Sequence, residues 1–298
     1  MRTRVYWAGL CSILLVLVLW TPVGGGSAVA GPTGPGYWLA AGDGGVFAFG
    51  HAPFLGSATH QCGFQCWGIG ATADGQGYWI VDNYPAADPN QIRLYGFGSA
   101  SDVQVPNPDG GPRAVASTPS SLGGWTLLSD GTVVPFGDAA WFGDASGLGL
   151  FGLSWPPFGS FLDYFVGIAS TPDGKGYWLA GVDGGVFAYG DASFYGSMGD
   201  QRLSAPVAGI ARTTDGHGYW LVSYDGGVFS FGDASFNGSM GGKQLNELMI
   251  GIAGDPQGTG YWTVALDGGV FAFGDAPYLG SMAGQFLSRP VYGIAASG

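Results

Sequence analysis

A short element, Gly-Tyr-Trp followed by apolar residues, recurs six times along this 298-residue chain. Its Trp stands at Trp38, Trp79, Trp125, Trp178, Trp220 and Trp262, and in the third copy Gly124 replaces the Tyr. The spacings are 41, 46, 53, 42 and 42 residues. A period in the forties, built from short apolar runs broken by Gly and Asp, is typical of a β-propeller or a similar closed array. Repeats beginning near 36, 77, 124, 176, 218 and 260 therefore predict one all-β propeller domain over residues 31–298.

Each regular unit predicts four short strands. In the fifth unit they are 209–211, 218–222, 228–231 and 236–240, with an Asp-Gly-Gly turn between the second and the third. Strands crowd where the sheets of a propeller converge, so the small Gly-Ile-Ala strand is expected innermost. The repeated Trp residues are expected to pack between neighbouring sheets and to be structural.

The two ends of the chain complement each other. The first unit begins at Gly36 without a preceding Gly-Ile-Ala strand, and the chain ends at 291–295 without a following Gly-Tyr-Trp. Pairing of the C-terminal strand with the first unit would remove an open sheet edge. This count predicts six blades of four strands each.

Composition supports this fold class. The chain is 46 % hydrophobic and 15 % aromatic, which excludes disorder for most of it. It contains 59 Gly and twenty Asp but one Glu and two Lys, and Asp and Gly collect in turns whereas Glu and Lys favour helices.

Residues 1–30 read as a secretory signal peptide. Arg2 and Arg4 precede an apolar run over 5–20, and the small residues 28–30 predict cleavage before Gly31. A retained anchor is the alternative, and the setting of Cys11 predicts no lipid. The mature protein is expected to be extracellular, either free or associated with the cell wall.

Charge excludes some partners. Without Arg2 and Arg4, seven basic residues face 21 acidic ones, a net charge of −14. Nucleic acid and anionic lipid repel a protein with this net negative charge, and neither is expected as a partner. Most Asp residues are expected to be solvated turn formers.

The two remaining cysteines, Cys62 and Cys66, predict a local disulfide, as an even pair in an exported chain usually does. The alternative is a metal site that adds His60, although three candidate ligands in one loop are a weak signal. Calcium at the Asp-Gly turns is conceivable, but the dense Asp pattern of a dedicated loop is missing. No metal and no cofactor are predicted.

Units two and three depart most from the repeat, and the irregular loops of blades one to three are where specificity is expected. The hairpin turn of unit two is replaced by 83–91, and unit three carries an aromatic insertion between Gly143 and Val166. We therefore expect ligand or partner contacts from five residues of these segments: Tyr84, Trp155, Phe158, Phe161 and Tyr164. Folding of the insertion over one mouth of the central channel is the alternative.

The sequence does not favour catalysis. None of His51, His60 and His217 stands in a nucleophile motif, and most Asp residues recur once per unit, as turn residues would. A carboxylate pair could come only from the nonrepeating Asp82, Asp88, Asp102, Asp109 and Asp163, and no spacing singles out two of them. No catalytic residue is predicted.

Units four to six resemble a repeat of secreted actinobacterial proteins, over residues 36–296; 171–178 and 183–192 show it best. The resemblance implies export from a Gram-positive cell and no particular chemistry. The turn at 171–178 is also similar to the Asp-box of sialidase-type propellers, a structural hairpin there. Lys175 and Tyr177 depart from that pattern, and the chain lacks the arginine cluster and the Glu that a sialidase needs.

These observations predict a noncatalytic binding or scaffold propeller at the cell envelope, with an envelope protein or glycan as partner. A carbohydrate-binding propeller with several equivalent sites is the first alternative. A glycan-acting hydrolase or lyase is the second.

Overall fold

A computed structural model describes residues 34–62, 65–82, 90–107, 111–150 and 164–298. The residues of the signal-peptide prediction therefore lie outside the described part. Gly31–Gly298 form one compact unit, and this unit is the one considered below. Across the described ranges, no helix is long and apolar enough to cross a membrane.

The described residues form six separate antiparallel sheets, and helix is limited to the short 3-10 turn η1 (Ser146–Leu148). The inner strands are β3 (Cys66–Ala71), β7 (Pro112–Ser117), β10 (Phe165–Ser170), β13 (Val207–Arg212), β16 (Met249–Gly254) and β19 (Val291–Ser297). The middle strands are β1 (Gly36–Ala41), β4 (Gly77–Asp82), β8 (Gly124–Leu128), β11 (Gly176–Gly181), β14 (Gly218–Ser223) and β17 (Tyr261–Ala265). The third strands are β2 (Val46–Gly50), β5 (Gln91–Gly98), β9 (Val133–Phe136), β12 (Val186–Gly190), β15 (Val228–Gly232) and β18 (Val270–Phe273). This arrangement is consistent with a β-propeller.

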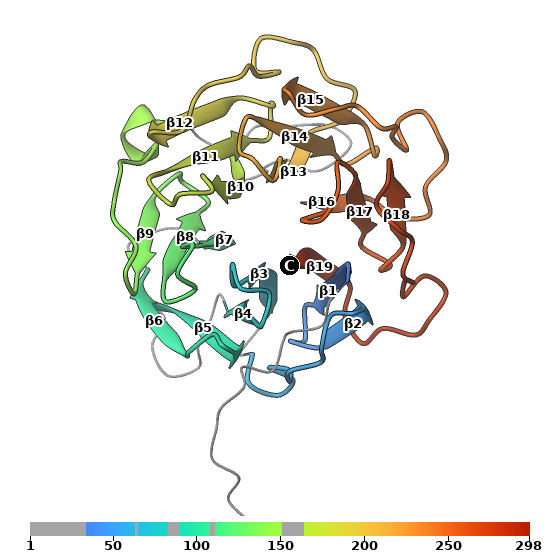
Figure 1. Ribbon diagram of the computed structural model, residues 1–298, viewed down its shortest axis with the longest axis horizontal. Helices are drawn as coiled ribbons and strands as arrows, with labels where there is room; N and C mark the ends of the chain where they lie inside the picture. The colour runs from blue at the N-terminus through green and yellow to red at the C-terminus, as the bar shows by residue number, and fades with distance from the viewer. Residues whose placement is uncertain (1–33, 63–64, 83–89, 108–110, 151–163) are drawn as a thin grey trace, which may run out of the picture. The chain divides into compact units, whose positions relative to one another are not determined.

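The inner strands face a common centre (Figure 1). They contact one another in the order β19, β3, β7, β10, β13, β16, and β16 contacts β19 again. The last strand, β19, pairs antiparallel with the first, β1, with Trp38 opposite Ala295. The β19-β1-β2 sheet is thus built from both ends of the chain.

Burial explains which sequence forms which strand. Every residue of the six middle strands is buried, so these strands read as continuous apolar runs without alternation. The inner strands need small residues because they approach one another closely. A Cβ on Gly70 would lie 2.9 Å from the carbonyl oxygen of Val115, and one on Gly293 would lie 3.1 Å from the nitrogen of Ile69.

The expectation of four strands per unit is wrong for five of the six sheets, which have three. The segment expected as a fourth strand runs outside the sheet, and the middle-strand Trp holds it. Each Trp donates its indole N–H to one carbonyl of this outer segment at 2.7–3.0 Å: Trp38 to Pro53, Trp79 to Ser101, Trp125 to Ala140, Trp178 to Ser193, Trp220 to Ser235 and Trp262 to Pro277. Side chains therefore satisfy backbone groups that a strand would satisfy by a ladder.

The repeated Tyr of each middle strand forms a hydrogen bond with the outer segment of the preceding sheet. Its hydroxyl donates to a glycine carbonyl there: Tyr37 to Gly280, Tyr78 to Gly56, Tyr177 to Gly143, Tyr219 to Gly196 and Tyr261 to Gly238. Where Gly124 replaces this Tyr, the outer segment of the preceding sheet forms a fourth strand instead, β6 (Val103–Pro106), paired with β5. The single four-stranded sheet thus coincides with the missing hydroxyl.

Candidate functional site

The inner strands line a central channel in three tiers. Side chains of a regular strand alternate between its faces, so the fourth and sixth residues of each inner strand point the same way. The second residue falls at a register shift against the middle strand, and the cavity that it lines shows where it lies. The fourth residues are Ile69, Val115, Ile168, Ile210, Ile252 and Ile294, and all six line a cavity of about 140 Å³. They form an apolar collar at the centre of the channel.

The second residues lie on one side of this collar and line a further cavity of about 290 Å³. We call them the entrance ring: Trp67, Arg113, Val166, Ala208, Ile250 and Tyr292. Tyr224, Leu248 and Leu266, from turns beside the inner strands, complete the lining. The collar position holds nearly one residue type, whereas the entrance ring holds six different ones.

Arg113 supplies the positive charge of the entrance ring. Its guanidinium carbon lies 4.9 Å from the centre of the Trp67 ring, and Trp67 meets Tyr292 edge to face with ring centres 5.3 Å apart. Burial lowers the pKa of Arg113, which nevertheless stays charged because its ordinary value is so high. Burial also raises the pKa of Tyr224, against the opposing effect of the Arg113 charge. The entrance ring is therefore a cation among aromatic and aliphatic side chains.

The sixth residues of the inner strands line the opposite end of the channel, around a cavity of about 300 Å³. Here Arg212 donates from one guanidinium nitrogen to the carbonyls of Thr213 and Thr214, both at 2.9 Å. Asp255 also lines this cavity, and burial raises its pKa, with the charge of Asp275 adding to the effect. Both arginine and carboxylate are bound into turns, so this end is a structural rim.

The predicted contact residues fall mostly outside the described ranges. Tyr84, Trp155, Phe158 and Phe161 are among the residues that the structure does not describe. Tyr164 is described and lies in the core. Its hydroxyl donates to Asp183 at 2.8 Å and its ring meets Phe165 at 4.9 Å, so it packs between sheets and presents no surface to a partner.

Cys62 and Cys66 form a disulfide directly before the entrance-ring residue Trp67. The bonded sulfurs are not thiolates, so the alternative of a metal site with His60 loses two of its three ligands. Of the nonrepeating carboxylates, Asp82 accepts from the Tyr95 hydroxyl at 3.3 Å and Asp102 pairs with Arg93 at 3.2 Å. Asp88, Asp109 and Asp163 lie outside the described residues.

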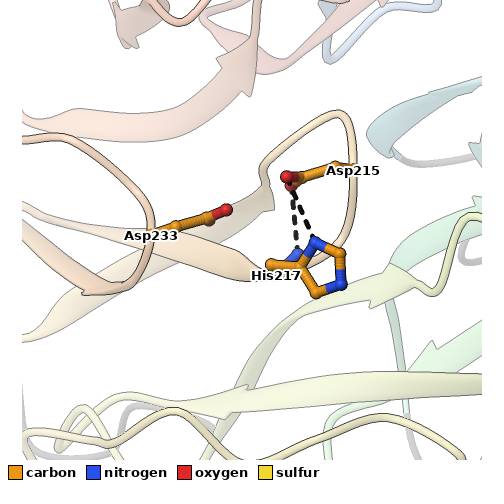
Figure 2. A group of neighbouring side chains, drawn as sticks. All are labelled: Asp215, His217 and Asp233. Atoms are coloured by element: carbon orange, nitrogen blue, oxygen red, sulfur yellow. Dashed lines mark hydrogen bonds and ion pairs between the residues drawn. The ribbon is translucent and has the colours of Figure 1, made fainter.

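Asp215, His217 and Asp233 come close enough together to hold a metal ion, with all ligand atoms within 4.8 Å. Figure 2 shows Asp215 bonded to His217, with Asp233 pointing toward the pair. The Asp215 carboxylate accepts from the His217 backbone at 3.1 Å and lies 3.2 Å from its Nδ1. All three side chains are exposed.

The equivalent turn of the preceding sheet explains this group without a metal. There Lys175 occupies the His217 position and pairs with Asp173 at 2.9 Å. In both turns a threonine hydroxyl, from Thr171 or Thr213, donates to the first Asp. Hydrogen bonds from Lys175, with Thr171, hold the pKa of Asp173 well below the usual range, and those from Thr213 and His217 do the same for Asp215. The group is a turn that recurs from sheet to sheet, and we assign no metal to it.

Comparison with known proteins identifies the fold. No protein-family model matches the chain, and no curated protein matches it in sequence. Among solved structures, it is similar to a chain in the crystal structure of the nidogen/laminin complex, with a TM-score of 0.57 and 11 % identity. The match covers 89 % of this chain and 98 % of the other. At this identity the likeness supports a β-propeller-like fold and nothing finer.

The geometry of the entrance ring suits binding. It offers a desolvated cation, two aromatic rings and several aliphatic side chains, but no activated nucleophile among the described residues lines it. Sequence reasoning missed these residues because each belongs to the inner strand, which reads as a plain Gly-Ile-Ala repeat. Aligning the six copies would have found them, because the second position of that strand is the one that changes every time.

Proposed function

We propose that this chain is a noncatalytic binding propeller that engages a protein partner at its entrance ring. The proposal includes closure of the six sheets into one six-bladed ring. The pairing of β19 with β1 and the contact between β16 and β19 support closure, since they join the two ends of the chain.

The observation that carries the proposal is Arg113 held against Trp67. The guanidinium, stacked on an aromatic face beside the Tyr292 ring, gives a partner a preorganised polar and aromatic contact surface. Arg113 is also one of few basic residues in an acidic chain. Its positive charge therefore favours an acidic partner surface at the entrance ring, against the net negative charge of the chain.

The residue types favour a protein partner. Trp, Tyr and Arg are the residues that dominate binding energy at protein interfaces, and the entrance ring contains one of each. The similar propeller chain comes from a protein complex, which supports the same class of partner. Strand β4 ends, and β10 begins, on this side of the channel, so Tyr84, Trp155, Phe158 and Phe161 stay predicted contacts with the same partner.

The test compares two arginines at opposite ends of the channel. The purified protein and its Arg113→Gln and Arg212→Gln variants would be immobilised and exposed to envelope and secreted proteins of the producing cell. We expect Arg113→Gln to weaken capture of the bound protein at least about tenfold, because the guanidinium contact beside Trp67 at the centre of the proposed interface is lost. Arg212→Gln should capture as the wild type does. Equal capture by Arg113→Gln, with an unchanged melting temperature, would refute the entrance ring as the site.

The proposal also places the protein outside the cell, at the envelope of a Gram-positive actinobacterium. The leader pattern over 1–30, the resemblance of the repeat and the Cys62–Cys66 disulfide support it, since disulfides persist in oxidising compartments. N-terminal sequencing of protein from the medium or cell wall should read from Gly31. Detection of the chain only in the cytoplasm would overturn this part without affecting the entrance ring.

The two alternatives differ in their support. A hydrolase or lyase needs converging nonrepeating carboxylates, and the two that the structure describes, Asp82 and Asp102, are each engaged with another side chain. A carbohydrate-binding role has a specific observation in its favour at a different place in the fold.

A further inference from the structure

Five of the six sheets carry one exposed aromatic side chain at the same place. It is the residue that follows the carbonyl bonded by the middle-strand Trp, on the outer segment described above. These rim aromatics are Phe54, Trp141, Phe194, Phe236 and Tyr278, and their exposed fractions all lie between 60 and 62 %. In the four-stranded sheet the position is taken by Asp102, which pairs with Arg93.

The outer segment can still place an apolar side chain in the core beside most of the exposed rings. The residue directly after the ring packs inward in four of the five sheets, as Leu55, Phe142, Tyr195 and Leu279 do. Extended chain alternates its side chains, so the segment places one apolar residue inside and one ring outside. A single exposed ring needs no explanation, but the same exposure at five equivalent positions does.

A polar side chain accompanies each ring three residues later. In four sheets this residue is a serine: Ser57, Ser197, Ser239 and Ser281. In the fifth it is Asp144. In the last unit the Tyr278 hydroxyl donates to the Ser281 hydroxyl at 3.3 Å, so ring and polar group lie side by side there. An aromatic face beside a hydroxyl is suited to a sugar, because the electron-rich face attracts C–H groups and the hydroxyl bonds the sugar hydroxyls.

We propose that the rim aromatics bind a neutral polysaccharide, one pyranose ring to each aromatic face. The position holds Phe, Tyr or Trp in all five sheets and never an aliphatic residue, which points to a planar stacking partner. The five rings belong to five different sheets, so a polymer of repeated units can engage several of them, whereas a compact partner reaches few. The net charge of the chain repels anionic polymers.

Several weak sites linked in this way give strong binding together. A single exposed ring covers little area, so each site is weak, but a polymer held at one site presents its next units at high effective concentration to the others. Avidity can exceed single-site affinity by about 10²–10⁴. This function is independent of the entrance ring and separates from it by mutation.

The experiment measures retention of the full mature protein on insoluble neutral polysaccharides, namely chitin, cellulose and β-1,3-glucan, with alginate as the anionic comparison. Variants replace one, two, three and all five rim aromatics by Ala. We expect binding to at least one neutral polymer and none to alginate. Each replacement should weaken binding about twofold to tenfold, and the fivefold variant should lose it. Phe236→Tyr should bind as the wild type does, because the aromatic face remains.

The matched control is Phe286→Ala, which removes an aromatic ring that is 93 % exposed but does not occupy the rim position. Arg113→Gln should also leave polysaccharide binding unchanged, so that this proposal and the protein-binding proposal fail separately. Exposed rings contribute little to folding, and the melting temperature of each variant checks that the fold is kept.

Three results would overturn the proposal. The first is a wild-type protein that binds none of the neutral polymers. The second is a fivefold variant that binds them as well as the wild type does. The third is a change of molecular mass in solution on removal of the rings, measured by light scattering, without any polymer binding. That result would make the rim an interface between copies of this chain.

Discussion

The middle strands and the entrance ring are both rich in Trp and Tyr but use them in opposite ways. Each of the six middle strands has a Trp that is at most 3 % exposed, with its indole N–H bonded to a backbone carbonyl. The entrance ring has one Trp and one Tyr, both only partly buried and each found in one unit only. The repeated aromatic residues hold outer segments to sheets, whereas the unrepeated ones line a cavity.

The comparison separates residues that serve the fold from residues that serve binding. Positions two and four of an inner strand lie two residues apart and line neighbouring cavities of the channel. Position four is Ile in five sheets and Val in the sixth, because it fills the same collar every time. Position two differs in all six, so packing does not dictate it. Variation within an otherwise regular repeat is therefore the mark of the site.

The largest expected effect comes from exchanging a middle-strand Trp. Trp178→Ala should lower the free energy of unfolding by about 3–5 kcal/mol, because it opens a cavity between sheets and frees the Ser193 carbonyl. Trp67→Ala should lower it by less than about 1.5 kcal/mol, since the ring is already partly in a cavity. Urea unfolding followed by circular dichroism measures both.

A second pair of readouts tests whether the two roles are separate. Trp67→Ala should abolish partner binding while Trp178→Phe, which keeps most of the packing, should preserve it. Equal destabilisation by the two alanine variants would show that the entrance ring is part of the folding core, and the distinction drawn above would be wrong.

The disulfide should matter at the entrance ring more than in the sheets. Opening the Cys62–Cys66 bridge is expected to cost about 2 kcal/mol by the loop-closure relation, since the loop that it closes is short. Melting temperature with and without reductant measures this, and the Cys62→Ser/Cys66→Ser variant should not respond to reductant. Binding of the partner should weaken too, because Trp67 follows Cys66 directly. A reduced protein with unchanged stability would contradict the prediction.

Much of the fold could be predicted from the sequence because the same strand and turn pattern occurs in six copies. The all-β class, the hairpins, the small inner strand and the buried Trp depend on local patterns that any one unit contains. The fourth strand was predicted wrongly because apolar spacing does not reveal that Trp and Tyr side chains replace the ladder. That replacement depends on contacts such as Tyr219 to Gly196, which join different units.

The site was harder to predict, for a physical reason. Attention to irregular segments led to Tyr164, which proves to be buried against Phe165, and to residues outside the described ranges. Arg113 was passed over because it stands in the inner strand, which sequence reasoning treated as structural. Its setting arises only when β3, β7 and β19 bring Trp67, Arg113 and Tyr292 to one end of the channel. Convergence of this kind requires the topology first.

A smaller effect is expected from removing one hydroxyl of the middle-strand Tyr. Tyr219→Phe should lower the free energy of unfolding by about 1–2 kcal/mol, because the Gly196 carbonyl loses its donor and the Tyr195 N–H its acceptor. Tyr292→Phe in the entrance ring should change it by less than about 0.5 kcal/mol. Chemical denaturation of both variants is the measurement. A Tyr219→Phe protein as stable as the wild type would argue that the outer segments do not depend on these bonds.

The smallest expected change in stability comes from the turn of the last unit in which Asp255 replaces the repeated Thr, and it tests whether this replacement is structural. Thr72, Thr118, Thr171 and Thr213 each donate a hydroxyl hydrogen bond to a glycine carbonyl five residues later, and Asp255 takes the equivalent place in the last unit. Its pKa is raised by burial and by the nearby Asp275 charge. Asp255→Thr should therefore raise the free energy of unfolding at neutral pH for two reasons: the restored hydroxyl bond contributes about 0.5–1 kcal/mol, and removal of the buried carboxylate adds to it.

The pH dependence of this gain gives the sharper test. Because the folded-state pKa of Asp255 lies above its unfolded value, the ionised carboxylate destabilises the native wild type at neutral pH. As pH falls through the folded pKa, the carboxyl takes up a proton and the wild type recovers, so the advantage of Asp255→Thr should shrink toward the hydrogen-bond contribution alone. Urea titrations at several pH values between neutral and about 4 follow the difference. An advantage that grew on acidification would mean that Asp255 is stabilised as a carboxylate, and its place at the Arg212 end of the channel would then call for a functional explanation.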